Sequence, residues 1–415
     1  MTALSVTVIV VSHNRSRWLH RCLIAIDQMD YPVFETVVVA CPDGASTARA
    51  LDLKRPVLVV DFNEANISKA RNLGVSHACG EILAFIDDDA VPEPTWLTHL
   101  AAAFDGTDIA QAGGITLGRN GISIQHTASL VDDFGQTHDV ATDATGPIEI
   151  TPSAHGVPRL HGTNMAFRRD TILDQNGFDP RFTFYLDETD LTLRISKTGA
   201  RTAFVPKAVV HHGTAQSRFR NSNRTPKTLW EIGASAAVFH RKHAALHHQQ
   251  DAKAALLHDR RRWLLGHMQR GSLTPDDVYR LLKQLEHGYS DGLTREFSKA
   301  PPISQTTQRE IPRFDPLANK DVYLIEHSFS KTEAAQALVQ DGHRVTVFEL
   351  SHSALFHRVT FTEDGVWRHT GGIYGKDLRT ERLVQLSTRS ARVARIMDRL
   401  KGIRYQAGAT YIASA

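Results

Sequence analysis

Short β-branched runs alternate with amphipathic stretches through the first hundred residues, and this alternation constrains the fold more than any other feature. The runs that predict strands are residues 6–11, 36–40, 57–61 and 82–86. Two stretches between them, residues 17–29 and 67–78, place apolar side chains on one helical face. A β-α-β series of this kind predicts an α/β fold with a largely parallel sheet, whose ligands bind beyond the carboxyl ends of the strands.

The composition is typical of a globular protein and excludes few functions by itself. With 415 residues, 41% of them hydrophobic and 22% charged, the chain is long enough for two or three domains. A net charge of +3 gives no argument for nucleic acid, and no such partner is expected. Cys22, Cys41 and Cys79 form no CxxC pair, and no leader or membrane-spanning run is evident, so we expect a cytoplasmic protein. The sequence predicts no oligomeric state.

Beyond the first hundred residues the pattern changes several times. Residues 114–158 are rich in Gly, Thr and Asp and are expected to be irregular, whereas residues 228–289 predict helices. Four prolines between residues 298 and 316 mark a linker. After it, strands are predicted at 321–326, 344–350 and 410–413, with helices at 331–340 and 379–400. We predict an N-terminal domain at 1–225, a helical extension at 226–298, a linker at 299–316 and a C-terminal Rossmann-like module at 317–415.

Three consecutive aspartates, Asp87, Asp88 and Asp89, follow the strand predicted at 82–86. Like charges packed this closely repel one another, so a cation is their natural compensation. Carboxylate oxygens favour Mg²⁺ or Mn²⁺, which commonly bridge carboxylates to the phosphates of a substrate. A solvated acidic turn is the alternative, and the surrounding motifs decide against it.

Those motifs follow one another in a fixed order along the chain. They are residues 8–15 (VIVVSHNR), 66–74 (NISKARNLG), 80–81 (GE), 91–97 (VPEPTWL), 162–169 (GTNMAFRR), 177–179 (GFD) and 187–194 (DETDLTLR). Together with the aspartates, the series resembles inverting family 2 glycosyltransferases with a GT-A fold, over roughly residues 5 to 220. The resemblance implies a GT-A catalytic domain of polysaccharide biosynthesis that uses a nucleotide-sugar donor and Mn²⁺ or Mg²⁺.

The resemblance also implies roles for single residues. The metal ligand that it implies is Asp89, with Asp87 as a contact to ribose or metal. The residues that it implies for nucleotide-sugar binding are Ser12, Asn14, Arg71, Asp87 and Asp88. For Asp88 a side chain turned inward is the alternative, and for Arg71 a surface salt bridge. The family's usual D-D-G-S turn after the second strand is replaced by A-C-P-D-G, in which Asp43 is the carboxylate that could read the base. A UDP-sugar is the expected donor and a dTDP-sugar the second choice.

An inverting transfer needs a general base to take the proton of the acceptor hydroxyl. Asp187 and Glu188 occupy the family's E-D pair with the two acids exchanged. Glu188 matches the base by position, and Asp187 is its rival. Capping of the following helix is the alternative role for this acidic group, and Asp190 suits that role.

Two further motifs complete the expected site. Gly162 and Asn164 belong to the family's acceptor-side G-x-N-x-x-F-R segment. His211 and His212 resemble the late histidine that completes the metal or diphosphate site in many GT-A enzymes. Neighbouring strand residues face opposite ways, so one of the two is expected at the metal, and motif position favours His211.

We therefore predict a metal-dependent inverting glycosyltransferase that transfers a sugar to a glycan or lipid-linked acceptor. A sugar nucleotidyltransferase is one alternative, although no Gly-rich phosphate loop with a lysine follows the first strand. A noncatalytic carbohydrate- or nucleotide-binding protein that retains the fold is another. The basic and aromatic stretch at 260–265 predicts a helix packed on its own domain, with peripheral contact to the inner face of a membrane as the alternative.

Overall fold

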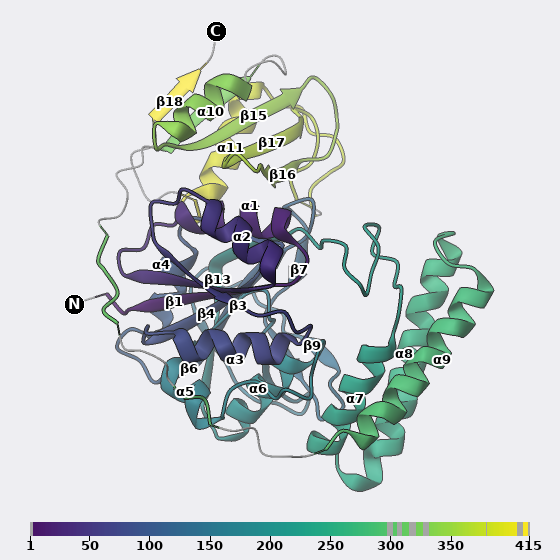
Figure 1. The fold of residues 1–415 in the computed structure, drawn as a ribbon. Coiled ribbons are helices and arrows are strands. Elements are labelled where there is room, and N and C mark those ends of the chain that lie inside the picture. Colours follow the sequence, from purple (N-terminus) through teal and green to yellow (C-terminus); the bar gives the residue numbers. More distant parts are fainter. Residues whose placement is uncertain are drawn as a thin grey trace.

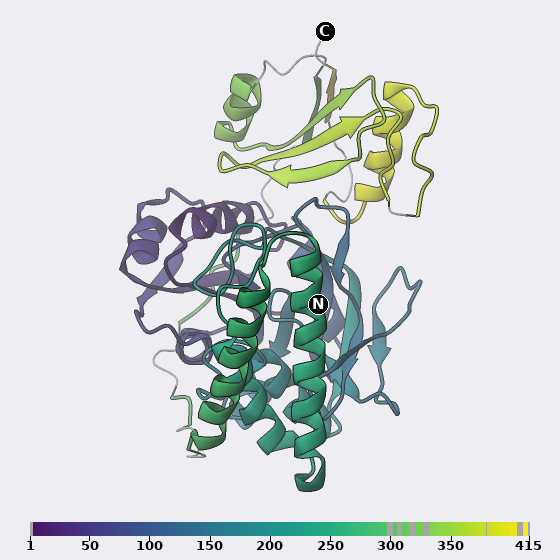
Figure 2. The ribbon, with the colours of Figure 1, turned by 90° about the vertical axis from the view of Figure 1, so that its right-hand side faces the viewer.

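The computed structural model describes residues 3–296, 302–304, 309–314, 321–326, 332–378, 380–404 and 410–413. Figure 1 shows a central α/β domain, a group of long helices beside it and a smaller α/β module. Figures 1 and 2 both show the module against one end of the central domain.

The central domain contains a ten-stranded sheet. Its strands are β1 (Val6–Ser12), β2 (Phe34–Ala40), β3 (Val57–Asp61), β4 (Ile82–Asp87), β5 (Ala90–Pro92), β6 (Ile109–Leu117), β7 (Ile124–His126), β10 (Ile148–Ile150), β12 (Met165–Arg168) and β13 (Arg201–His212). Eight strands lie in the order β10-β13-β6-β12-β4-β1-β2-β3, while β5 pairs with β13 and β7 with β6. The first four strands are parallel, and the antiparallel β12 joins β4 to β6.

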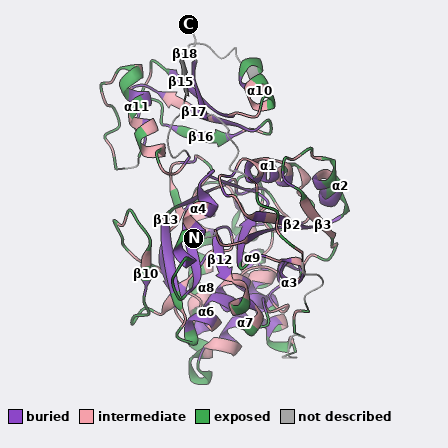
Figure 3. Ribbon diagram, turned by 90° about the vertical axis from the view of Figure 1, so that its left-hand side faces the viewer, coloured by how far each residue is buried: buried purple, intermediate pink, exposed green. Residues whose placement is uncertain are grey.

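Helices cover both faces of this sheet. They are α1 (Ser16–Asp27), α2 (Pro42–Ala50), α3 (Ile67–His77), α4 (Trp96–Phe104), α5 (Arg169–Asp174) and α6 (Asp187–Lys197). Along β1, Val8 and Val10 pack with α1, α2 and α4, whereas Ile9 packs with α3, α5 and α6. This alternation follows from the two-residue period of a strand, and it makes the central strands of the sheet a buried layer, purple in Figure 3.

The four strands and two helices predicted in the first hundred residues are confirmed, with ends within two residues of those expected. The prediction for residues 114–158 was wrong in part. This region contains the end of β6 and several three-residue strands, including the separate sheet β11-β8-β9 formed by β8 (Ser129–Val131), β9 (Thr137–Asp139) and β11 (Val157–Arg159). Strands this short carry no readable periodicity. In β6, position 114 is a glycine because a Cβ there would lie 2.0 Å from the carbonyl oxygen of Ala208. A glycine at this position interrupts the β-branched pattern from which a strand is predicted.

The helical extension is confirmed as helical and packs on the central domain. It contains α7 (Trp230–His243), a 3₁₀ turn (Leu246–His248), α8 (Gln249–Gln269) and α9 (Pro275–Thr294). Gly233 and Gly288 let α7 and α9 cross closely, since a Cβ at Gly233 would lie 2.1 Å from the Leu285 carbonyl oxygen. Phe239 of α7 joins Phe182 in a buried cluster of the central domain. Among the described residues, no helix is both long and apolar enough to cross a bilayer.

The C-terminal module is a second α/β unit. It contains β14 (Asp321–Glu326), β15 (Arg344–Ser351), β16 (Arg358–Phe361), β17 (Val366–Gly372), β18 (Thr410–Ala413), α10 (Thr332–Gln340) and α11 (Arg389–Leu400). Its strand order is β16-β17-β15-β14-β18, and only β16 is antiparallel to its neighbour. The helix predicted at 379–400 begins later, because Thr388 caps it by accepting from the amide of Ala391.

Part of the predicted linker at 299–316 lies outside the described residues. The described part runs along the central domain. Its Arg309 Nη2 lies 2.5 Å from Glu35 Oε2, and the amide of Phe314 donates to the carbonyl oxygen of Pro32. The domain boundaries themselves stay a prediction.

One buried ion pair fastens the module to the central domain. Arg404 donates from Nε and Nη2 to the two oxygens of Glu93, at 2.8 and 2.6 Å, and both side chains are buried. The guanidinium also lies 3.9 Å from the ring centre of Trp367. Although burial opposes it, the charge of Arg404 lowers the pKa of Glu93 to about 2. Glu93 is therefore charged at neutral pH and depends on this partner.

We expect Arg404→Met to lower the free energy of unfolding by about 3–5 kcal/mol, because the Glu93 carboxylate then stays buried without its main partner. This decrease in stability should have its full size above pH 4.5, the ordinary pKa of glutamate. It should shrink as the pH falls toward 2, because protonation of Glu93 removes its charge. Chemical denaturation across this pH range measures it. The control combines Glu93→Gln with Arg404→Met, which removes both charges. A single variant as stable as this control would contradict the prediction.

Candidate active site

The three aspartates lie at the carboxyl end of β4, where the sequence predicts them. Asp87 is the last residue of β4, and Asp88 and Asp89 form the turn into β5. β5 pairs antiparallel with the end of β13, so that Ala90 lies opposite His212. The pairing places the acidic turn beside the two histidines that end β13.

Asp88 turns away from the cleft into the domain. Its Oδ2 accepts from Ser12 Oγ at 2.7 Å, and its Oδ1 lies 2.8 Å from Arg15 Nη2. Burial raises the pKa of Asp88 to about 7, against the opposing charge of Arg15. Asp88 therefore takes the inward-facing position that the sequence left as the alternative to a contact with the nucleotide sugar.

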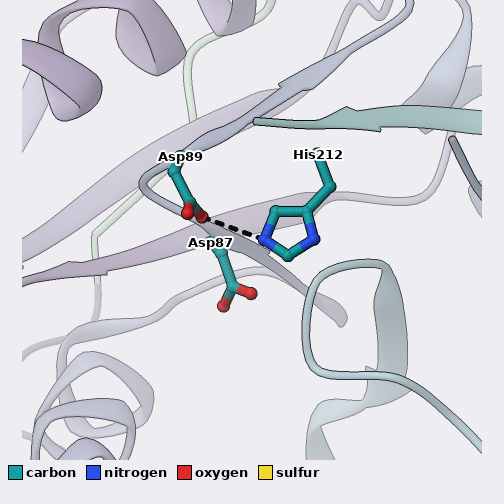
Figure 4. A group of neighbouring side chains, drawn as sticks. All are labelled: Asp87, Asp89 and His212. Carbon is teal, nitrogen blue, oxygen red and sulfur yellow. Dashed lines mark ion pairs between the residues drawn. The ribbon is translucent and has the colours of Figure 1, made fainter. Parts of the chain in front are cut away.

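Asp87, Asp89 and His212 form a compact group, in which one ligand atom from each lies within 4.8 Å of the others. Figure 4 shows the three side chains side by side, with the contact between Asp89 and His212 dashed. His212 Nε2 lies 3.2 Å from Asp89 Oδ1, while Asp89 Oδ2 accepts from the amide of Ala215 at 2.7 Å. Although burial opposes it, the charges of His212 and Arg15 hold the pKa of Asp89 well below its usual range.

The donor set of this group fits a divalent cation. Nδ1 of His212 lies 3.2 Å from Oε1 of Gln125, an oxygen that can only accept. Nδ1 donates in this contact, so with a cation bound the ring would keep its proton on Nδ1 and offer the lone pair of Nε2 to the ion. Two carboxylates and one imidazole suit Mn²⁺, and the carboxylates alone suit Mg²⁺.

His211 points to the other side of β13, so the expectation that favoured it as the metal-side histidine is corrected. Its Nε2 lies 2.8 Å from Glu93 Oε1, and its ring lies 5.1 Å from that of Trp367 in the C-terminal module. The sequence showed that only one histidine could face the aspartates. It could not show which, because the choice depends on the register of β13 against β5.

Arg71 links the acidic turn to the candidate base. Its side chain is buried, with Nη1 at 2.5 Å from Asp187 Oδ2 and Nη2 at 3.3 Å from Asp87 Oδ1. Arg71 Nη2 also donates to the carbonyl oxygen of Gly162 at 3.3 Å, and a Cβ on Gly162 would lie 2.7 Å from that same nitrogen. Gly162 thus makes room for the arginine, and the surface salt bridge considered for Arg71 is excluded.

Asp187 and Glu188, at the start of α6, differ in their surroundings. Asp187 is buried against Arg71, and burial raises its pKa. Glu188 is partly exposed, and its Oε1 lies 3.3 Å from Arg159 Nη2. Although burial opposes it, the charges of Arg159 and Arg71 lower the pKa of Glu188. Of the pair, Glu188 is the carboxylate that is both ionised and accessible. Asp190 is held by Arg194 and His243, in keeping with a structural role.

A cavity of about 390 Å³ opens beside the acidic turn, at the carboxyl ends of β1 and β2. Ser12, Asn14 and Arg15 form one side, and Phe184 and Phe219, stacked at 3.8 Å between ring centres, contribute to another. This volume lies in the range of small-molecule sites. Since Arg15 also contacts Asp89, the cavity adjoins the acidic group.

Two predicted site residues lie elsewhere. Asp43 is exposed in the first turn of α2 and is not part of the cavity wall; among the residues that form this wall, the carboxylate is Glu64. Asn164 is buried, accepting from Trp96 Nε1 at 2.8 Å and donating to the carbonyl oxygens of Ile115 and Ala208. These contacts hold Asn164 inside the domain, and its acceptor-side role stays a prediction.

Several residues of the site were not found from the sequence. Thr163 donates to Asp87 Oδ2 at 2.7 Å, and Arg220 Nη2 lies 3.5 Å from Asp89 Oδ2. Arg15, Arg159 and Gln125 were also missed. Arg15 lies inside the motif at 8–15 and could have been found there. Arg159 and Gln125 belong to the region of three-residue strands, which carries no sequence signal.

Comparisons with known proteins agree with this geometry. A family model described as Glycosyltransferase like family 2 matches residues 3–231, which is more than half of the chain. A glucosyl-dolichyl phosphate glucuronosyltransferase of Haloferax volcanii is 24% identical over 241 residues, 55% of this chain and 75% of that protein. The succinoglycan biosynthesis protein ExoM of Rhizobium meliloti is 28% identical over 189 residues, 44% of this chain and 58% of that protein.

Among solved structures, a mannosyltransferase of Pyrobaculum calidifontis in complex with GDP-Man and Mn²⁺ is 16% identical. The match covers 71% of this chain and 89% of that chain, with a TM-score of 0.43. The family match and the observed α/β domain confirm the predicted fold class and enzyme class. The chain belongs to the family 2 glycosyltransferases, enzymes of the GT-A fold.

Proposed function

We propose that the enzyme is metal dependent and inverting, and that it transfers a sugar from a nucleotide-sugar donor to a hydroxyl of a glycan or lipid-linked acceptor. A UDP-sugar is the first choice of donor and a dTDP-sugar the second. The observation that carries the proposal is the group of Asp87, Asp89 and His212 beside the cavity lined by Ser12 and Arg15.

In this proposal Asp89, Asp87 and His212 hold Mn²⁺ or Mg²⁺. The ion supplies positive charge to the departing diphosphate. Ser12 and Asn14 line the cavity for the nucleotide, and Arg15 adds a cation at the end nearest the diphosphate. Arg71 keeps Asp87 and Asp187 in place, which makes it a positioning residue.

Glu188 is the proposed general base. It takes the proton of the acceptor hydroxyl as that oxygen attacks the anomeric carbon, whose bond to the diphosphate breaks. Its lowered pKa keeps Glu188 ionised at neutral pH, the form in which a carboxylate can accept a proton. Asp187, locked against Arg71, orients the start of α6 instead.

The products of the donor separate this reaction from its alternatives. With Mn²⁺ and a UDP-sugar, a glycosyltransferase releases UDP, whereas a sugar nucleotidyltransferase forms or consumes pyrophosphate. Nucleotide binding without release of UDP over a broad acceptor panel would favour the noncatalytic alternative.

Residues 1–298 contain every group proposed to act in the chemistry. Glu93 and His211, which contact Arg404 and Trp367 of the module, lie directly behind the metal group. We therefore propose that the module supports the site structurally. Cytoplasmic location and contact with a membrane stay predictions.

The first test of the proposed function asks whether His212 or His211 binds the metal ion. We expect His212→Ala to lower the affinity for Mn²⁺ at least about tenfold, because one ligand is lost. His211→Ala, its neighbour on the opposite side of β13, is the control and should change Mn²⁺ affinity little while lowering stability. Electron paramagnetic resonance of free Mn²⁺ measures the affinity in the presence of UDP. Equal losses in the two variants would contradict the assignment.

The base gives the second test. Glu188→Gln should lower kcat by about 10²–10⁴-fold, because the proton acceptor is removed, and should leave the Kd for UDP and Mn²⁺ unchanged. Asp187→Asn is the comparison, and its effect should include weaker Mn²⁺ binding, since Arg71 loses a partner beside Asp87. Transfer rates and calorimetric titrations give both quantities. If Asp187→Asn alone abolished transfer with binding intact, the two roles would be exchanged.

A further inference from the structure

The C-terminal module has a patch of exposed apolar side chains, which we call the apolar loop patch. It consists of Leu355, Phe356, Leu378, Leu383, Val384 and Leu386, with exposed fractions from 42% to 94%. These residues are half of the large hydrophobic side chains that are exposed among the described residues. Single exposed hydrophobic residues are common on protein surfaces, whereas a gathering of this kind marks a contact with a partner or a membrane.

Two loops at one end of the module form the patch. One follows β15 and the other follows β17, and because these strands are parallel, both loops begin at the carboxyl end of the sheet. The amide of Gly372 donates to the carbonyl oxygen of Leu355 at 2.9 Å, and Gly375 forms an isolated bridge with Val384. These backbone contacts hold the loops together, so their apolar side chains share one region of the surface.

The side chains of the patch project from the module. Leu386 is 94% exposed, and Leu355 and Leu383 are 64% and 62% exposed. A bilayer closes around a projecting apolar group and removes it from water without offering a preformed groove. The shape of the patch therefore suits insertion into a lipid layer.

The charged side chains at the border of the patch are basic. Lys376 Nζ lies 5.0 Å from the ring centre of Phe356. Arg382 precedes Leu383 and is exposed, and Arg358, also exposed, begins β16 two residues after Phe356. Apolar side chains flanked by cations are typical of surfaces that bind anionic membranes.

The acidic residues of the same region are engaged within the module or lie at its other end. Asp377 is buried, and its Oδ2 lies 2.5 Å from Arg399 Nη2. Glu381 Oε2 accepts from the amide of Asp377 at 2.6 Å. Glu363 and Asp364 lie in the turn before β17, at the opposite end of that strand from the patch. The positive charge at the border of the patch is therefore left for a partner.

We propose that the apolar loop patch docks the enzyme on a membrane surface that contains anionic lipids. Such a bilayer supplies an apolar interior for the leucines and negative headgroups for Lys376, Arg358 and Arg382. A second copy of the chain would instead bring like charges together, which is unfavourable. The inference goes beyond the proposed function, because docking needs neither the metal group nor a donor.

The patch differs from the stretch at 260–265, which the sequence offered as a membrane contact. In that stretch Trp263 is 37% exposed and Leu264 is buried. Arg260 Nη2 donates to the Tyr185 hydroxyl at 2.9 Å. The stretch is thus partly engaged within the protein, and it offers a bilayer less apolar surface than the module does.

The test is sedimentation of the full chain with vesicles of phosphatidylcholine, with and without phosphatidylglycerol. The chain should bind the anionic vesicles more tightly, and added NaCl should weaken the binding. Leu383→Ser combined with Leu386→Ser should lower the partition coefficient at least about tenfold, because two side chains no longer enter the bilayer. Arg382→Gln should lower it about fivefold. Leu246→Ser, at a leucine that is 86% exposed in the helical extension, is the matched control and should bind normally.

Three outcomes would overturn the inference: equal binding to both kinds of vesicle, binding of the double variant that equals that of Leu246→Ser, or loss of binding in Trp263→Ser instead. Sedimentation equilibrium tests the other occupant, since a dimer that the double variant dissociates would mean that a second copy covers the patch. Arg382 is exposed, so Arg382→Gln keeps the test decisive if the double variant does not fold. Failure of donor binding would remove the proposed function and leave this inference standing.

Discussion

Three consecutive carboxylates at the end of one buried strand can coexist only if each has its own partners, and the geometry of the site follows from this requirement. Asp88 is held by Ser12 and Arg15 from the end of β1 and the turn after it. Asp87 is held by Arg71 of α3, and Asp89 by His212 of β13. The compensating groups come from elements far apart in the sequence, so charge compensation brings those elements to one point. Asp87 and Asp89 are the two of the three that are grouped with His212, and this donor set suits a cation.

How much of the structure could be predicted from the sequence depends on the length of each hydrophobic pattern. Strands of five to seven residues and helices of eleven or twelve were predicted closely, because hydrophobic periods show over such lengths. Asp87 and Asp89 were predicted because they follow such a strand. The choice between His211 and His212 needed the pairing of β13 with β5, and Asn164 needed the packing of Trp96. The pairing of β13 with β5 and the packing of Trp96 both join residues far apart in the sequence, so no local pattern predicts either of them.

The C-terminal module touches the site from behind. Glu93 joins His211 of β13 to Arg404 of the module, and Arg404 Nη1 donates to His369 Nε2 at 2.8 Å. The proton of His369 is then on Nδ1, facing His357 Nε2 at 2.9 Å. Burial lowers the pKa of both histidines, that of His357 to about 3. These two histidines are therefore neutral at physiological pH, and they support the group of Asp87, Asp89 and His212 as part of a fixed structure rather than as a switch.

The cavity beside the acidic turn and a second cavity of about 210 Å³, between the β8–β9 hairpin and helices α7 and α8, differ in how their walls relate to the family. The wall of the first comes from β1, α3 and the segments around Phe184 and Phe219, all within the residues that the family model matches. The α7 and α8 side of the second comes from residues beyond that match, such as His240 and Arg260. Arg159 contacts both Thr137 of the second wall and Glu188. The donor-side cavity is therefore built from the part of the chain that the family shares, whereas the second cavity depends on the helical extension as well.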